Sequence, residues 1–279
     1  MCLIRCASLI CLVFAPDISR AQLPLSPVPR SGQTVTPVYE GWYRNADGSF
    51  SLSFGYYNRN SAEVIELPVG ADNFIAPGDS NQGQPARFEV RRHWGVFAVK
   101  VPANFGQRKV TWTIRMRGET FAIPGSLHPD WEIDALAGEA GTGNTPPVLK
   151  LPGAPLSSGS LVAQGPGGAV GGPLTASVGQ PLELTIWATD DGRGAGSVAG
   201  ARGNAQVTLM WFKHQGPGDV TFSAPSPRPA PDDGRASTTA TFSRPGSYIL
   251  RVRANDSSVS GAGHAQCCWT NGFVVVTVK

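Results

Sequence analysis

The chain carries little charge and few histidines. Only 15% of its 279 residues are charged, against about 25% in an average soluble domain, and its formal net charge is +3. The basic residues are scattered, which excludes the clustered patch that nucleic-acid binding requires. His93, His128, His214 and His264 stand far apart, and no G-x-S-x-G, H-E-x-x-H or phosphate-loop motif occurs. The sequence thus lacks the patterns typical of serine hydrolases, zinc proteases and nucleotide-binding enzymes, and no catalytic residue is predicted.

Long apolar runs are also missing, apart from one near the amino terminus. A short apolar stretch, residues 6–15, follows Arg5, and the small residues Ser19 and Ala21 come next. This order is typical of a secretory signal peptide over residues 1–21, cleaved after Ala21. The stretch is shorter than the roughly 20 residues that a membrane-spanning helix needs. We therefore expect a mature chain without a membrane span, secreted, periplasmic or held at the cell surface.

Export makes the few cysteines informative. Three of the five lie in the predicted leader, which leaves the adjacent Cys267 and Cys268 in the mature chain. An oxidising compartment permits disulfides, and the only intramolecular partner of each cysteine is its neighbour. A vicinal disulfide that pins the turn beside Trp269 is the favoured interpretation. A rigid loop that presents Trp269 to a ligand, metal binding with His264, and an intermolecular disulfide stay open.

Helical patterns are scarce, whereas turn-forming residues are abundant. The chain has 34 glycines and 24 prolines, and its one helix-like run, residues 130–140, is weak. Asp47-Gly48 favours a hairpin turn. Apolar and polar residues alternate with the period of a β-strand in the segments 50–57, 94–101, 109–116, 182–188, 207–212, 237–242 and 248–254. Residues 273–278 predict a last strand that is apolar on both faces. Short strands separated by turns predict an all-β chain built from β-sandwiches.

Composition also suggests where the chain divides. Residues 22–36 are rich in proline and serine and predict an extended linker, and residues 136–148 predict a second linker that ends in two prolines. Residues 37–135 and 149–279 are then expected to form two sandwiches in tandem, of immunoglobulin or fibronectin type. Between the second linker and residue 176 we expect only one short edge strand.

Four stretches of the second half follow a known pattern: NTPPV, VGQPLELTIWATDDG, VTLMWFKHQGPGDVTF and TATFSRPGSYILRVRANDS. Through them, residues 144–279 resemble the PKD and cadherin-like branch of immunoglobulin-like domains, with WFKHQG in place of the W-D-F-G-D-G often found there. Trp211 is expected at the centre of the sandwich because of its large apolar area. Tyr248 is expected either to form a tyrosine corner, bonding back to the backbone at the preceding turn, or to be an ordinary core residue.

The first half contains YEGWYRNADGSFSLSFGYYNRN and RRHWGVFAVKVP. These stretches are similar to a recurrent pattern in exported bacterial proteins, and that similarity brings no activity with it. The strand count predicts a second sandwich here.

The resemblance also implies a calcium site at one end of the second sandwich. Asn144, Asp190, Asp191 and Asp256 would supply hard oxygen ligands, of which calcium takes six to eight. The simpler explanation, which we weigh more heavily, is that Asp-Asp-Gly and Asn-Asp-Ser are turn formers. No other cofactor is predicted.

Aromatic residues provide the remaining candidate site. Four aromatic residues of the first half occupy both odd and even strand positions: Trp42, Tyr43, Tyr56 and Tyr57. Odd and even positions of a regular strand face opposite sides, so some of these side chains must point away from the core. We therefore predict a binding surface for a protein or a glycan, unless loops or the second domain cover it; its residues are Trp42, Tyr43, Tyr57 and Trp269.

We expect an exported, non-enzymatic binding or adhesion module of the bacterial surface or extracellular space. The alternatives are an enzyme or accessory domain acting on polysaccharide, and a structural spacer.

Overall fold

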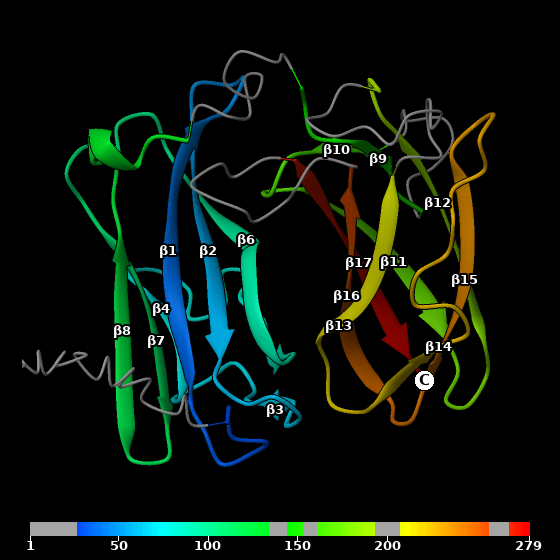
Figure 1. Cartoon of the computed structure of the whole chain (residues 1–279), viewed down its shortest axis with the longest axis horizontal. Helices are drawn as coiled ribbons and strands as arrows, with labels where there is room; N and C mark the ends of the chain where they lie inside the picture. Colours follow the sequence, from blue (N-terminus) through cyan, green and yellow to red (C-terminus); the bar gives the residue numbers. More distant parts are fainter. Residues whose placement is uncertain (1–26, 134–143, 153–160, 193–206, 257–267) are drawn as a thin grey trace, which may run out of the picture.

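The computed structural model describes residues 27–133, 144–152, 161–192, 207–256 and 268–279, which form an all-β fold (Figure 1). Their one helical element is a short 3-10 turn, η1 (Pro129–Trp131). The predicted fold class is therefore confirmed. The predicted leader, residues 1–21, and most of the predicted linker 136–148 lie outside the described residues. The described residues include no helix long and apolar enough to span a membrane.

The first half holds strands β1 to β8. Their bounds are β1 (Val35–Arg44), β2 (Phe50–Asn58), β3 (Ile65–Glu66), β4 (Asn73–Ala76), β5 (Arg87–Phe88), β6 (Arg91–Val101), β7 (Val110–Met116) and β8 (Glu119–Gly125). One antiparallel sheet has the order β1-β2-β6 and the other has the order β4-β7-β8, while β3 and β5 pair by themselves. The sheet of β1, β2 and β6 and the sheet of β4, β7 and β8 enclose one hydrophobic core.

Strand β2 shows how the alternating sequence builds that core. Leu52, Phe54 and Tyr56 lie on one face of the strand and are at most 1% exposed. The ring of Phe54 stacks on Phe97 of β6 and meets Trp112 of β7 edge-on, with centroids 5.4 Å and 6.2 Å away. The predicted Asp47-Gly48 turn joins β1 to β2, and Gly48 adopts a φ of +81° that favours glycine.

The second half holds strands β9 to β17. Their bounds are β9 (Val148–Lys150), β10 (Val162–Gln164), β11 (Ala169–Ala176), β12 (Leu182–Thr189), β13 (Thr208–Gln215), β14 (Val220–Phe222), β15 (Arg235–Phe242), β16 (Gly246–Asn255) and β17 (Trp269–Val278). One sheet has the order β10-β9-β12-β15-β14 and the other has the order β11-β17-β16-β13. All strand pairs are antiparallel except β11 with β17, which run parallel.

The region before residue 176 contains more strand than the sequence predicts. Both β10 and β11 lie there, where one short edge strand was expected. The glycines that suggested a loop let strand β11 approach its neighbours closely. A Cβ on Gly171 would lie 2.6 Å from the carbonyl oxygen of Pro152. Glycine here is therefore a packing residue in a strand.

Two predictions about the core of the second half are confirmed. Trp211 is 3% exposed and its ring stacks on Phe222, with centroids 6.0 Å apart. Tyr248 is fully buried, and its hydroxyl donates a hydrogen bond to the carbonyl oxygen of Arg244, 2.8 Å away. That bond is the one expected of a tyrosine corner.

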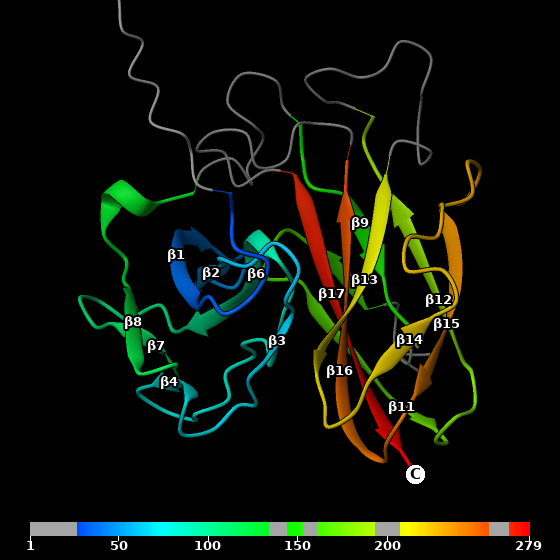
Figure 2. The same ribbon diagram turned by 60° about the horizontal axis from the view of Figure 1, so that its bottom comes forward.

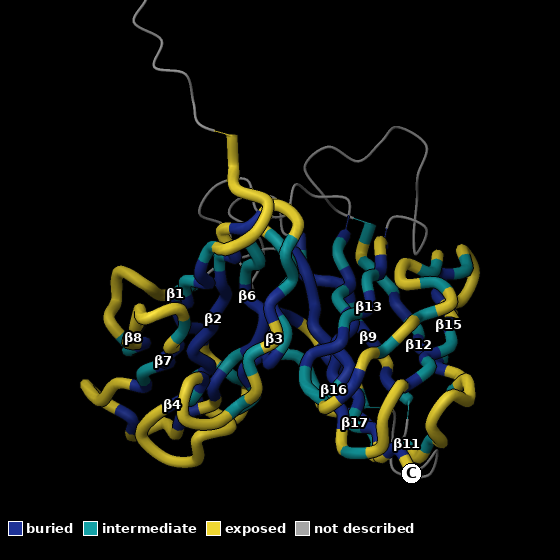
Figure 3. Tube along the Cα trace, turned by 90° about the horizontal axis from the view of Figure 1, so that it is seen from below, coloured by how far each residue is buried: buried dark blue, intermediate teal, exposed yellow. Residues whose placement is uncertain are grey.

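The sheets stack as successive layers across the molecule (Figure 2). The sheet β1-β2-β6 lies between the sheet β4-β7-β8 and the β17-β16-β13 part of the second half. Buried chain accordingly continues across the boundary between the halves, while exposed chain lies mainly in connecting loops (Figure 3). Phe273 of β17 and Ile249 of β16 pack against the hydrophobic core of the first half. We call this contact the interface.

Candidate functional site

Trp131 is the most exposed large aromatic side chain among the described residues, with 51% of its surface accessible. It ends the 3-10 turn η1, where the sequence suggested a weak helix. His128 caps the turn, since its Nδ1 accepts a hydrogen bond from the backbone N–H of Asp130 at 3.3 Å. The backbone N–H of Trp131 donates to the His128 carbonyl oxygen at 3.0 Å. Pro129 at the start of the turn fixes its φ angle.

Strand β1 holds this turn in place. The indole Nε1 of Trp42 donates to the carbonyl oxygen of His128 at 2.8 Å, and the N–H of Ile133 donates to the carbonyl oxygen of Trp42 at 2.7 Å. Gly41 has a φ of +127°, and a Cβ there would lie 2.5 Å from the carbonyl oxygen of Trp131. Only glycine at this position therefore lets the turn lie so close to β1.

Charged residues flank Trp131 in the chain, and one of them pairs with the end of β1. Arg44 Nε and Glu132 Oε1 form an ion pair at 3.2 Å, and both side chains are exposed. Asp130 is exposed as well, with its Oδ2 3.6 Å from Nδ1 of His128. The rings of Tyr39 and Trp131 are in tilted contact, with centroids 5.9 Å apart. We name Trp131, Tyr39, Arg44, Asp130 and Glu132 the Trp131 surface.

Three of the four aromatics predicted to form a binding surface are buried. Trp42 is 4% exposed, Tyr43 is 9% exposed and Trp269 is 2% exposed, so the expectation that they are exposed is wrong. Trp42 packs in the core of the first half. The hydroxyl of Tyr43 bonds to the backbone of Gly167 in the second half. Tyr57 alone is half-exposed, with the guanidinium of Arg91 5.5 Å from its ring centroid.

Trp269 is buried because the first half covers the outer face of strand β17. Its Nε1 donates to the carbonyl oxygen of Gly95 at 3.3 Å. The same oxygen accepts a second hydrogen bond, at 2.7 Å, from Nδ2 of Asn271. Asn271 Nδ2 also donates to the carbonyl oxygen of Pro166 at 2.7 Å. The alternative interpretation, that the second domain covers part of the aromatic set, therefore holds for Tyr43, whereas Trp269 is covered by the first half.

Charged groups also lie in the interface. Lys213 Nζ is 3.1 Å from both carboxylate oxygens of Glu66, and Arg87 Nη1 is 2.7 Å from Glu66 Oε1. Arg251 is 2% exposed and forms no ion pair with a described carboxylate. Its guanidinium lies 4.4 Å from the ring centroid of Phe212. Burial lowers the pKa of Arg251 to about 10, and the group stays charged at neutral pH.

Two histidines lie in the interface, His214 buried and His93 partly buried. His93 stacks on Tyr56 with centroids 4.9 Å apart, and His214 meets Phe273 edge-on at 5.1 Å. Burial, followed by the positive charge of Arg251, lowers the pKa of each to about 3. Both rings are therefore neutral at physiological pH. Both rings therefore contribute to the packing of the interface as neutral groups.

The four residues predicted to bind calcium lie at one end of the second half. Asn144 Nδ2 donates to Asp256 Oδ2 at 2.8 Å, and Asp191 Oδ2 accepts from the hydroxyl of Thr145 at 2.9 Å. Asp190 Oδ2 accepts from the N–H of Gly192 at 2.9 Å, which is a turn contact. Within the described part of the chain, no three His, Cys, Asp or Glu side chains are arranged to hold a metal. The calcium site stays a prediction.

Asp190 has an unusual environment for an acidic residue. Burial, followed by the nearby charges of Asp256 and Asp191, raises its pKa to about 6. Cys268 lies at the same end and accepts a hydrogen bond from Asn144 Nδ2 at 3.1 Å. Cys268 is disulfide-bonded, and Cys267 lies outside the described residues. The vicinal pairing of these two cysteines stays a prediction.

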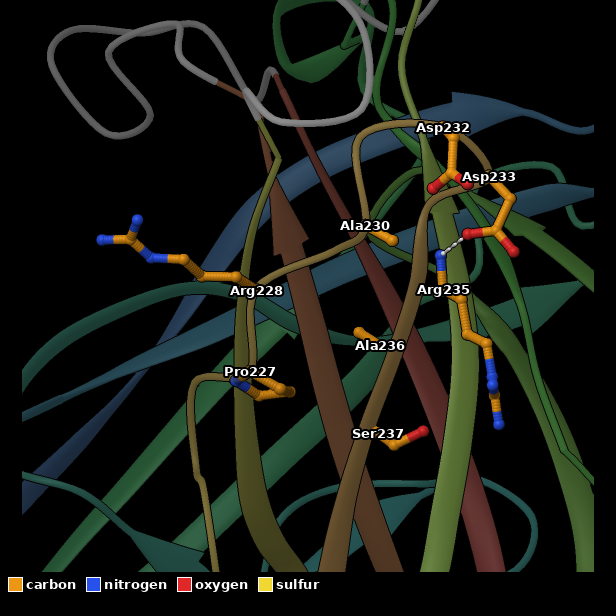
Figure 4. A pocket seen from close by; sticks show the side chains of 8 residues that line it. All are labelled: Pro227, Arg228, Ala230, Asp232, Asp233, Arg235, Ala236 and Ser237. Carbon is orange, nitrogen blue, oxygen red and sulfur yellow. Dashed lines mark hydrogen bonds between the residues drawn. The ribbon is translucent and has the colours of Figure 1, made fainter.

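An open pocket lies under the connection between β14 and β15 (Figure 4). Its volume is about 520 Å³. Asp233 Oδ1 accepts a hydrogen bond from the N–H of Arg235 at 2.8 Å, while Arg228 points away from Asp232 and Asp233. The described lining holds neither histidine nor cysteine. Asp233 therefore bonds within the turn, and no described ion pair joins either aspartate to Arg228.

Neither a protein-family profile nor a curated protein matches this chain. Solved structures with some similarity include the D00-D0 domain of intimin, at 11% identity and a TM-score of 0.27, covering 88% of this chain and 100% of that one. Another is the S-layer protein SbsC, residues 31–844, at 10% identity and a TM-score of 0.25, covering 88% of this chain and 28% of that one. Domains 4 and 5 of SbsC align at 10% identity and a TM-score of 0.23, covering 88% and 98%. At these values the function must be argued from this chain's own residues.

The sequence does not predict the Trp131 surface. Its segment favours only a weak helix beside a linker, a pattern that gives no reason to expect an exposed aromatic residue. A signal was present, because Pro129 two residues before a tryptophan favours a fixed turn over a helix interior. The exposure itself was not predictable, since it depends on how the turn lies against β1.

Proposed function

We propose that this chain is an exported, non-enzymatic binding or adhesion module of the bacterial cell surface or extracellular space, and that it holds its ligand on the Trp131 surface. The leader-like residues 1–21 support export. The PKD-like character of the second half belongs to the same proposal, as a scaffold of surface proteins.

The observation that carries the proposal is a half-exposed tryptophan on a fixed turn. Hydrogen bonds to Trp42 and the close approach of Gly41 fix the turn, yet 51% of Trp131 stays accessible. Single exposed apolar side chains are common on protein surfaces and do not by themselves indicate a binding site. A rigid aromatic that is already ordered loses little conformational entropy when a ligand binds, which favours affinity.

The chemistry around Trp131 favours a glycan ligand. A pyranose ring presents a face of C–H groups that stacks on an indole, and hydroxyls at its edge that bond to charged side chains. Asp130 and Glu132, the chain neighbours of Trp131, supply acceptors, and Arg44, paired with Glu132, supplies donors. The ring of Tyr39 contacts the indole. The arrangement thus offers an apolar platform with a polar rim.

A glycan array probed with the mature chain tests the proposal. We expect binding to a subset of bacterial polysaccharides and at least about a tenfold loss with Trp131→Ala, since aromatic anchors dominate such contacts. Val178→Ala is the matched control, because Val178 is an exposed apolar residue of the second half at 40% accessibility. Equal binding by Trp131→Ala and the intact chain would contradict the proposal. Release of reducing sugar from a bound glycan would favour the rival enzyme function.

A structural spacer is the second candidate, and the interface favours it. Hydrogen bonds from Trp269 and Asn271 to Gly95, and the Lys213–Glu66 ion pair, fix the two halves against each other. A spacer needs that rigidity and no ligand. Absence of any glycan or protein ligand, together with a fixed distance between labels in the two halves, would support it.

We also propose calcium binding by Asn144, Asp190, Asp191 and Asp256, with other oxygen ligands completing the shell. The support is that these side chains lie at one end of the second half and that the charges of Asp256 and Asp191 act on Asp190. Calcium should raise the Tm and Asp190→Asn should remove that effect. A Tm unchanged by calcium and by EDTA would leave these residues as turn formers.

A further inference from the structure

A pocket of about 160 Å³ lies in the interface, and residues from both halves line it. Phe97 and Ala98 of β6 come from the first half. Val170 of β11, Ile249 of β16 and Phe273 of β17 come from the second. It is separate from the Trp131 surface, and none of the residues predicted to bind a ligand or a metal lines it. Boundaries between domains are a common place for small-molecule sites.

The size of the pocket limits what it accepts. A cavity of about 150 Å³ lined by apolar side chains accommodates one benzene molecule, so this pocket suits a single ring and not a sugar chain. Phe97 and Phe273 are nearly fully buried, which makes their positions in the pocket wall fixed. Val170 is 59% exposed and lies at the open side. A ligand would therefore enter past β11.

His214 gives the pocket one polar preference. It is 2% exposed, lines the pocket, and its Nε2 is 2.8 Å from the carbonyl oxygen of Gly83. A carbonyl oxygen only accepts, so Nε2 carries the proton and donates. Burial lowers the pKa of His214 to about 3, so its other nitrogen, Nδ1, has a lone pair and no proton. No described residue donates to Nδ1, which leaves it as an acceptor for a ligand.

We propose that the interface pocket binds a small aromatic molecule that carries one O–H or N–H donor, such as a phenol. The ring fills the apolar space between Phe97, Ile249 and Phe273, and the donor bonds to Nδ1 of His214. Since both halves line the pocket, the ligand binds only when they are joined and stabilises that joined form.

The experiment is an NMR titration of the mature full-length chain with phenol, and with toluene as a partner of nearly equal size without the donor. We expect saturable shifts of the Val170 and Ile249 methyl groups with phenol, and binding of toluene about fivefold weaker, as one neutral hydrogen bond contributes. His214→Phe should remove the difference between the two probes. Shifts that do not saturate, or that fall outside the pocket, would overturn the proposal.

Two further variants block the pocket in different ways. Ala98→Leu fills it from the β6 side, and Val170→Trp covers its open side on an exposed edge strand. Each should weaken phenol binding at least about tenfold, because the added atoms occupy the ligand's volume. The matched controls are Ala71→Leu and Val162→Trp, at exposed positions that do not line the pocket. Unchanged binding by a folded Val170→Trp protein would contradict the proposal even if Ala98→Leu fails to fold.

Discussion

The indole nitrogen of Trp269 in the last strand donates a hydrogen bond to the backbone oxygen of Gly95, 3.3 Å away and 174 residues earlier in the chain. The two residues lie on facing sheets of the two halves. Trp269, which the sequence analysis assigns to a candidate binding surface beside a turn, is instead buried in the interface. The two halves therefore meet through residues of β6 and β17.

Gly95→Ala tests that contact. Gly95 has a φ of +45°, and a Cβ there would lie 2.6 Å from Cζ2 of Trp269, so the halves must separate or the ring must move. We expect a loss of about 1–3 kcal/mol in the free energy of unfolding, as for other overpacked sites. Urea denaturation measures it. Gly106→Ala is the control, because Gly106 has a φ of +61° and no atom within 4 Å of the added Cβ. Equal losses in the two variants would show that backbone strain alone acts.

Tyr248→Phe removes the hydroxyl of the tyrosine corner and keeps the ring. We expect a loss of about 1 kcal/mol, because the Arg244 carbonyl oxygen loses its bond while the packing stays. Tyr57→Phe serves as the comparison, since the Tyr57 hydroxyl has no hydrogen bond to a described residue. A Tyr248→Phe protein as stable as the original in thermal unfolding would argue against the corner.

Much of the fold was predictable because strands with one buried face alternate. Phe54, Trp211 and Tyr248 stand in such patterns and lie in the cores as expected. Strand β17 was the harder case, since its sequence is apolar on both faces. That pattern is typical of a strand covered on both sides, and Phe273 packs on the first half from its outer face. The sequence pattern predicts the strand, whereas the segment that covers its outer face is visible only in the structure.

The candidate sites were less predictable, for a physical reason. Exposure of Trp131 and burial of Trp42 and Trp269 depend on contacts between segments far apart in the chain. The local sequence determines which side chains share a face of a strand. Packing between distant segments determines whether the outward face is exposed to solvent or covered by protein. The tyrosine corner was predictable because its bond spans only four residues.

Acid should weaken the fold through His93 and His214. Their pKa values in the fold, about 3, lie below the ordinary 6.5, so the unfolded chain binds more protons between those pH values. The stabilisation is complete above pH 6.5 and is lost as the pH falls towards 3. Each histidine lowers the stability by at most about 1.4 kcal/mol per pH unit in that window.

Urea denaturation between pH 7.5 and 4.5 measures this effect. His93→Phe, which keeps a ring against Tyr56, should flatten the dependence. His128→Gln should leave it unchanged, because His128 is exposed. A pH dependence of the same slope in His93→Phe and in His128→Gln would mean that His93 is not the source.

Cys268 should resist alkylation until the protein is reduced. It is disulfide-bonded, and the expected partner is Cys267. Intact mass measured on the denatured monomer should be two hydrogens below the thiol form, with two alkyl groups added only after reduction. A disulfide-linked dimer would place the partner on another chain. Immediate double alkylation without reductant would exclude a disulfide.

The most direct test of the central claim, that the two halves act as one body through the interface, is hydrogen exchange followed by mass spectrometry across a urea titration. Peptides from β7 in the first half and β15 in the second are the probes. Because Phe273, Trp269 and the Lys213–Glu66 ion pair join the halves, both peptides should lose protection at the same urea concentration. Loss of protection in β7 at a clearly lower concentration than in β15 would show two independent domains and contradict the account.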